Sequence, residues 1–332
     1  MHYYYLIAGL TEYPFDIESV AAGNGVRVDV PQVKAQIIDE LTPADRRAVE
    51  LLYTYYDIRN IVGYVRGTRL PFNELGNLSR EEVAFLVDRQ AADATAAGEA
   101  EEEVTERLER LAVPREVRQA VDQFKGYGEM QDGELVPLSA EDLERELLTG
   151  FYRACGANGF SVAGAMIGGA AVPEYLRRWA EYDRTVRNIV AAYRARQLGV
   201  ATELREGMIV EADAEVREAL VGGQAADFGM KDRFPYTEEL LQVLETADFV
   251  ERERKMDLLR AEMADDLAEQ DYFGIGRVMN YLIRLNILHR WAALDPAQGR
   301  ESFRELVADL ADPDRIVTSV GEASASAGSQ LH

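Results

Sequence analysis

Several carboxylate side chains lie close together in this sequence, and two of these pairs are considered for acid–base chemistry. Asp265 and Asp266 are adjacent, and Glu251 and Glu253 lie two residues apart. Two neighbouring carboxyl groups can act as general acid and general base. These pairs stand within strongly charged helical patterns, and we interpret them as solvated helix faces.

The residue types give little support for metal or phosphate chemistry. The chain has three His and one Cys, and no Glu-x-x-His pair of the kind that indicates a di-iron helical bundle. The glycines between residues 156 and 169 are not followed by the Gly-Lys-Ser/Thr of a phosphate-binding loop. We therefore expect no metal site, no cofactor and no catalytic residue, and we expect Cys155 and His289 to be structural.

A four-residue motif, Arg-Asn-Ile-Val, occurs twice in the sequence, and we call it the repeated word. It begins at residue 59 and again at residue 187, and in both copies another Arg follows seven residues after the first. Apolar residues recur around each copy at the spacing of an amphipathic helix. The candidate interface or structural residues are Arg59, Asn60, Arg66, Arg187, Asn188, Arg194 and Arg196.

These residues have two interpretations that the sequence leaves open. An Asn at the border of an apolar stripe often bonds to a neighbouring loop, and an Arg seven residues from another is often the wet side of a helix. Because the pattern occurs twice in an acidic protein, it indicates either a shared structural tie or a shared surface for an acidic partner.

The charge of the chain excludes some classes of partner. The net charge is −23 at pH 7, and only four of the 36 basic residues are Lys. Such a surface repels nucleic-acid backbones and anionic lipid headgroups, so we expect neither nucleic-acid binding nor direct lipid insertion. A hydrophobic content of 47% is enough for a core, and one Cys excludes an internal disulfide framework, which fits a cytoplasmic location.

The apolar segments are too short or too polar to direct the chain into a membrane. The N-terminal residues lack the basic region and cleavage site of a signal peptide. The longest apolar stretch, residues 159–172, is shorter than the roughly 20 residues of a spanning helix. Its Gly164 and Gly168 form a small-xxx-small pattern, which fits either a buried core segment or an exposed element that docks on another protein.

The periodicity predicts an all-α fold, mainly helical, with room for one or two short strands near the N-terminus such as residues 26–30. Thr42 with Pro43, Ser79 with Glu82, and Ser139 read as helix starts. A further helix is expected from 236 to about 249. We divide the chain into three helical lobes with pseudo-repeats, at 1–125 with an acidic linker at 91–103, at 139–225 and at 226–316, followed by a disordered tail at 317–332.

Several segments, in their order along the chain, resemble a known family. They are residues 3–10, the Tyr-Asp-x-x-Asn helix at 56–66, its counterpart at 182–198, residues 226–229 and residues 251–259. Together they look like an uncharacterised bacterial family encoded among V-type ATPase genes. That family is similar to the C subunit of V/A-type ATPases, which is the counterpart of the eukaryotic d subunit.

The resemblance implies a non-catalytic, funnel-like helical protein of three similar lobes. Such a protein sits in the central stalk of a rotary ATPase and couples the rotor shaft to the membrane proteolipid ring for proton or sodium transport. It is cytoplasmic and attaches to the membrane through these protein partners. The alternatives are a soluble helical enzyme with a carboxylate and Arg site, and a cytosolic helical adaptor.

Overall fold

The computed structural model describes residues 2–24, 29–68, 71–89, 99–127, 138–156, 166–167, 170–210 and 212–294. Contacts divide the chain into two units. The first comprises Met1–Tyr13 and Val28–Ile287, and the second comprises Pro14–Arg27 and Leu288–His332. Each unit is described by itself.

The described elements are almost all helices, which confirms the all-α prediction. The second unit contains α2 (Ile17–Ser19) and the π-helix η1 (Val20–Asn24), and α14 (Ile275–Ala292) begins in the first unit and ends in the second. The other helices of the first unit are α1 (Tyr4–Gly9), α3 (Val30–Asp39), α4 (Pro43–Val65), α5 (Arg80–Asp88), α6 (Glu99–Arg110), α7 (Arg115–Lys125), α8 (Ala140–Ala154), α9 (Glu174–Gln197), α10 (Thr202–Arg205), the 3-10 helix η2 (Glu206–Met208), α11 (Ala214–Gly222), α12 (Thr237–Leu244) and α13 (Phe249–Ala268).

The strands observed in the described residues are not near the N-terminus. Strand β1 (Met166–Ile167) pairs antiparallel with β2 (Ala170–Ala171). The N-terminal apolar segment forms helix α1. Of the strand expected at 26–30, Val30 begins helix α3, because Asp29 caps that helix by accepting a hydrogen bond from the Gln32 N–H.

Three predicted helix starts are confirmed by their capping bonds. The Thr42 side chain accepts from the Asp45 N–H, with Pro43 as the first residue of α4. Ser79 and Glu82 form a reciprocal capping box at α5. Ser139 caps α8.

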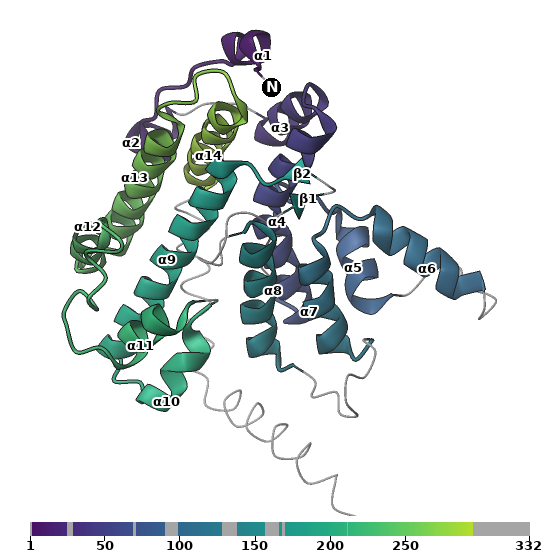
Figure 1. Cartoon of the computed structure of the whole chain (residues 1–332). Coiled ribbons are helices and arrows are strands. Elements are labelled where there is room, and N and C mark those ends of the chain that lie inside the picture. The colour runs from purple at the N-terminus through teal and green to yellow at the C-terminus, as the bar shows by residue number, and fades with distance from the viewer. Residues whose placement is uncertain are drawn as a thin grey trace, which may run out of the picture. The chain divides into compact units, whose positions relative to one another are not determined.

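Helices α4, α5, α7 and α8 form one group of packed helices in the first unit (Figure 1). Helix α8 packs closely on α7 at Gly150, where a Cβ atom would lie 2.9 Å from the Glu116 carbonyl carbon and oxygen. Large side chains on these helices are fully buried, namely Tyr53, Ile58, Ile61, Leu86, Leu143, Leu147 and Tyr152.

Helices α9, α11, α12 and α13 form a second packed group in the same unit (Figure 1). Its core gathers aliphatic, aromatic and methionine side chains, among them Tyr182, Ile189, Leu220, Phe228, Met230, Leu240, Leu259 and Met263. Within the described residues no helix is both long and apolar enough to cross a membrane.

The three-lobe division stays a prediction. Helix α8, which we placed at the start of a second lobe, packs mainly on α7 and α4. Residues 91–98 of the expected linker, most of the 159–172 stretch and the whole tail at 317–332 lie outside the described residues.

Candidate functional site

The two asparagines of the repeated word make the same pair of hydrogen bonds. Asn60 Nδ2 donates to the Asn73 carbonyl at 2.9 Å, and the Asn73 N–H donates to Asn60 Oδ1 at 2.9 Å. Asn188 Nδ2 donates to the Val210 carbonyl at 2.7 Å, and the Val210 N–H donates to Asn188 Oδ1 at 2.9 Å. Each Asn therefore ties its long helix to the chain that returns beside it.

The elements that follow each tie are also alike. The chain after Asn73 leads to Ser79, which caps α5, and the chain after Val210 leads to Asp213, which caps α11. Helices α5 and α11 each pack on the long helix that precedes them, α4 and α9 respectively. The repeated word thus marks a repeated unit of long helix, tied return loop and short capped helix.

The copy of this repeat that is built on α4 has additional buried side chains, the anchors, that hold its return loop. Asp57 accepts hydrogen bonds from the Asn77 N–H at 2.7 Å and the Leu78 N–H at 2.9 Å. Lys34 Nζ donates to the Leu75 carbonyl at 2.8 Å and lies 4.0 Å from the centre of the Tyr53 ring. The return loop of α4 is therefore held by an acidic, a basic and an amide side chain together.

Burial shifts the pKa of both ionisable anchors. It raises the pKa of Asp57 to about 7, against the opposing effect of the backbone N–H groups and of Lys34. It lowers the pKa of Lys34 to about 8. Gly76 is required here, because a Cβ atom would lie 2.5 Å from Asp57 Oδ1.

Arg187 lies at a junction between three helices and is largely buried. Its Nε donates to Tyr152 Oη of α8 at 3.2 Å, and its Nη2 donates to Tyr55 Oη of α4 at 3.2 Å. Tyr152 donates in turn to Asp183 Oδ2 of α9 at 2.6 Å. This chain of bonds joins the group of α4 and α8 to α9.

Two further candidate arginines are structural ties within the first unit. Arg66, at the end of α4, pairs with Glu144 of α8 at 3.0 Å. Arg196 donates to the Ala225 and Gly223 carbonyls, both at 2.8 Å, and lies over the Phe228 ring. The remaining candidates, Arg59 and Arg194, are exposed, and within the described chain neither forms a hydrogen bond or ion pair through its side chain.

The sequence left open whether these residues are structural ties or a surface for an acidic partner, and the structure gives different answers for different residues. The asparagines share one structural role in both copies. The arginines at equivalent positions do not, because Arg59 is exposed where Arg187 is largely buried, and Arg194 is exposed where Arg66 is paired. Arg59 and Arg194 remain the candidates for a partner surface.

A related sequence in α14, Leu-Asn-Ile around Asn286, lacks the Arg of the repeated word and is tied differently. Asn286 Oδ1 accepts a hydrogen bond from Tyr53 Oη at 3.1 Å, and both residues are buried. Asp265, from the adjacent carboxylate pair, accepts from Asn280 Nδ2 at 2.9 Å and pairs with Arg284. Asp265, one of the carboxylates considered for acid–base chemistry, is therefore engaged in contacts between α13 and α14.

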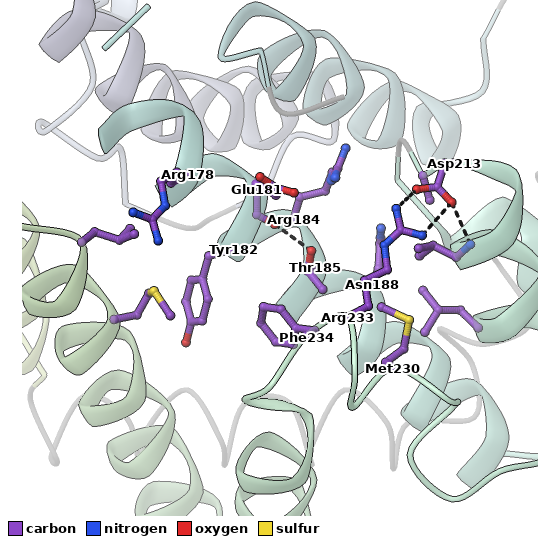
Figure 2. A pocket seen from close by; sticks show the side chains of 15 residues that line it. Arg178, Glu181, Tyr182, Arg184, Thr185, Asn188, Asp213, Met230, Arg233 and Phe234 are labelled. Carbon is purple, nitrogen blue, oxygen red and sulfur yellow. Dashed lines mark hydrogen bonds and ion pairs between the residues drawn. The ribbon is translucent and has the colours of Figure 1, made fainter. Parts of the chain in front are cut away.

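A pocket with a volume of about 200 Å³ opens beside α9. The α9 pocket, as we name it, is lined by Arg178, Glu181, Tyr182, Arg184, Thr185, Asn188, Ala212, Asp213, Val216, Leu220, Met230, Arg233, Phe234, Met263 and Leu267. Figure 2 shows Arg178 and Tyr182 towards one side, and Asp213 with Arg233 towards the other. Among the described residues no group of His, Cys, Asp and Glu could hold a metal ion.

The fold and the repeated helical unit define the class of this protein. The chain is an all-α protein with a duplicated, asparagine-tied helical unit. It belongs to the family described as "Protein of unknown function (DUF2764)", whose model matches residues 1–155 and 165–313. No curated protein matches the chain.

Sequence reasoning missed the anchors and the pocket because their partners are distant in sequence. Lys34 and Asp57 bond to residues 75–78, and the pocket combines α9 with residues from α11, α13 and the 230–234 segment. The sequence did hold one indication of the anchors. Lys34 and Asp57 stand at positions where the apolar spacing of their helices predicts a buried residue.

Proposed function

We propose that this chain is a non-catalytic central-stalk subunit of a rotary V/A-type ATPase. It joins the rotor shaft to the membrane proteolipid ring and so takes part in proton or sodium transport. The observation that carries the proposal is the repeated helical unit tied by Asn60 and Asn188. Repeated helical lobes are what the resemblance to the C subunit of these ATPases implies.

The packing of the helices suits a part that transmits torque. A joint under load must not bend, and close-packed helices with low compressibility supply that stiffness. Arg187 adds hydrogen bonds across the contact between α8, α4 and α9. Gly150 permits backbone contact between α7 and α8.

The α9 pocket gives little support to the alternative of an acid–base enzyme. A general acid needs a carboxyl group that keeps its proton near neutral pH. Partial burial acts to raise the pKa of Asp213, but the Val216 N–H and Arg233 outweigh it, and the pKa lies below its ordinary value. Asp213 is thus a charged cap of α11, which favours the binding role.

Transport assays on membrane vesicles test the proposal. We would delete the gene in its native host, prepare inverted vesicles, and measure ATP-driven ion uptake together with ATP hydrolysis. We expect ion uptake through the V/A-type ATPase to be lost, because the shaft no longer turns the ring, and a plasmid copy to restore it. Uptake that is unchanged in the deletion strain would refute the proposed function.

A further inference from the structure

We propose that the α9 pocket binds a small organic anion, specifically a carboxylate attached to one aromatic ring or a branched aliphatic group. The proposal concerns a ligand site and does not depend on the rotary function. It rests on three properties of the pocket, which are the charge of its wall, the chemistry of its floor, and its size.

The wall of the pocket is cationic in a chain that is strongly acidic. Three arginines line it, at positions 178, 184 and 233, against two carboxylates. Asp213 is engaged by Arg233 and by the Val216 N–H, and Glu181 pairs with Arg177 at 3.6 Å. Both negative groups are therefore already matched by protein cations or N–H groups.

Arg178 is the cation that remains available. Its side chain is exposed, and within the described part of the chain it forms no hydrogen bond or ion pair. The guanidinium group presents paired N–H donors that match a carboxylate in a bidentate arrangement. Figure 2 shows Arg178 on the same side of the pocket as the Tyr182 ring.

Eight of the fifteen side chains that line the pocket are apolar or aromatic, and we call these the floor. The Tyr182 and Phe234 rings lie with their centres 5.7 Å apart, and Met230, Met263 and Leu267 complete the lining. Polar lining groups are satisfied by the protein, since Asn188 bonds to Val210 and Thr185 donates to the Glu181 carbonyl at 2.7 Å. An apolar body therefore fits the floor better than a sugar would.

The size restricts the ligand. A volume of about 200 Å³ lies below the roughly 300–1,000 Å³ of pockets that hold drug-sized molecules. A nucleotide is too large to be enclosed, whereas a single ring or a branched chain with one carboxylate can be. The recognition expected is one ionic contact at Arg178 and burial of the apolar body against the floor.

Intrinsic fluorescence offers a direct test, because Trp179 is adjacent to Arg178 and its ring centre lies 5.8 Å from that of Tyr182. The chain has two Trp, so a Trp291→Phe variant carries Trp179 as its single reporter. We would titrate this folded variant with sodium phenylacetate, using phenylacetamide as the neutral analogue and sodium chloride as the blank. We expect a saturable change with phenylacetate, and binding at least tenfold weaker with phenylacetamide.

A matched pair of substitutions on α9 assigns the charge. Arg178→Gln should weaken phenylacetate binding at least tenfold. Arg194→Gln, which removes an exposed Arg of the same helix outside the pocket, should change it less than twofold. The absence of a saturable signal, equal binding of the amide, or equal effects of the two substitutions would each overturn the proposal.

Discussion

At the scale of single residues, two asparagines perform one task in different surroundings. Asn188 and its partner Val210 are both buried, at 2% and 5% exposure. Asn60 is also buried, but its partner Asn73 is partly exposed. Water can replace a lost partner at Asn73, whereas the Val210 peptide group would be left unsatisfied.

This difference predicts the relative cost of removing each tie. Asn188→Ala should lower the free energy of unfolding by about 2–4 kcal/mol, because the buried N–H and carbonyl of Val210 both lose their partner. Asn60→Ala should cost about 1–2 kcal/mol, since Asp57 and Lys34 still hold the same loop. Urea unfolding followed by circular dichroism measures both. A larger loss for Asn60→Ala would contradict the assignment.

Asp57 predicts a pH dependence of stability. Because burial raises its pKa to about 7 in the folded state, the folded protein binds more protons than the unfolded protein between about pH 4 and 7. This group should therefore make the free energy of unfolding fall as pH rises through that window, by at most about 1.4 kcal/mol per pH unit. Asp57→Asn should remove this contribution.

The measurement is the difference between the two proteins in urea unfolding at pH 5 and pH 7. Carboxylates with lowered pKa values, such as Asp88 and Asp213, act in the opposite direction and are common to both proteins. Only the change caused by the substitution is therefore informative. A wild-type protein that loses no more stability than Asp57→Asn between these pH values would show that Asp57 is ionised throughout.

The sequence identified both asparagines but could not identify what they bind. Their position at the edge of an apolar stripe predicts a bond to a loop. The partners lie 13 and 22 residues further along, in segments with no periodic pattern, so only the folded chain reveals them. Arg59 is exposed and Arg187 is largely buried because different helices pack beside them. The repeated word contains no information about these neighbouring helices.

At the scale of elements, helix α9 contrasts a buried arginine with an exposed one. Arg187 and Arg194 lie two turns apart on the same side of the helix. Arg187 bonds to Tyr152 and Tyr55, whereas Arg194 is exposed. The pair therefore separates the effect of the helix junction from the effect of losing a positive charge.

Arg187→Ala should lower the free energy of unfolding by about 2–4 kcal/mol, because the Tyr152 and Tyr55 hydroxyl groups lose their donor and Asp183 loses one nearby cation, Arg260 being another. Arg194→Ala should change it by less than about 0.5 kcal/mol. Chemical unfolding of the two variants under one set of conditions provides the comparison. Equal effects would mean that the junction does not stabilise the contact between the helices.

Helix starts were the most predictable elements, because a capping side chain acts within three residues of its partner. Thr42, Ser79 and Ser139 were all identified for this reason. The prediction of a single helix from 236 to about 249 placed the end of that helix wrongly. The helix stops at Leu244, and Asp248 caps α13 by accepting from the Glu251 N–H at 2.7 Å, a competing start that the apolar periodicity conceals.

At the scale of the whole molecule, the strongly acidic chain repels acidic partners, so exposed arginines are the positions where acidic groups of a partner can bind. If Arg59 and Arg194 contact acidic groups of the ATPase, reversing their charge should weaken assembly without changing the fold. We expect Arg59→Glu with Arg194→Glu to reduce the amount of chain that co-purifies with the complex at least fivefold. Arg115→Glu, at an exposed position of α7, is the control and should have no effect.

The sequence predicted the all-α class and the duplication, since both follow from local periodicity and a repeated word. It could not predict which segments make up the first unit, because that unit is held together by contacts between residues distant in sequence, such as Tyr53 and Asn286. Membership of a single family along residues 1–155 and 165–313 shows that these segments occur together.

The most direct measurement of the central claim is affinity isolation of the tagged chain from detergent-solubilised membranes of its native host, followed by mass spectrometry. The account predicts recovery of the catalytic A and B subunits, the shaft subunits and the proteolipid of a V/A-type ATPase, in amounts that an untagged strain does not give. Recovery of the tagged chain with none of these subunits would contradict it.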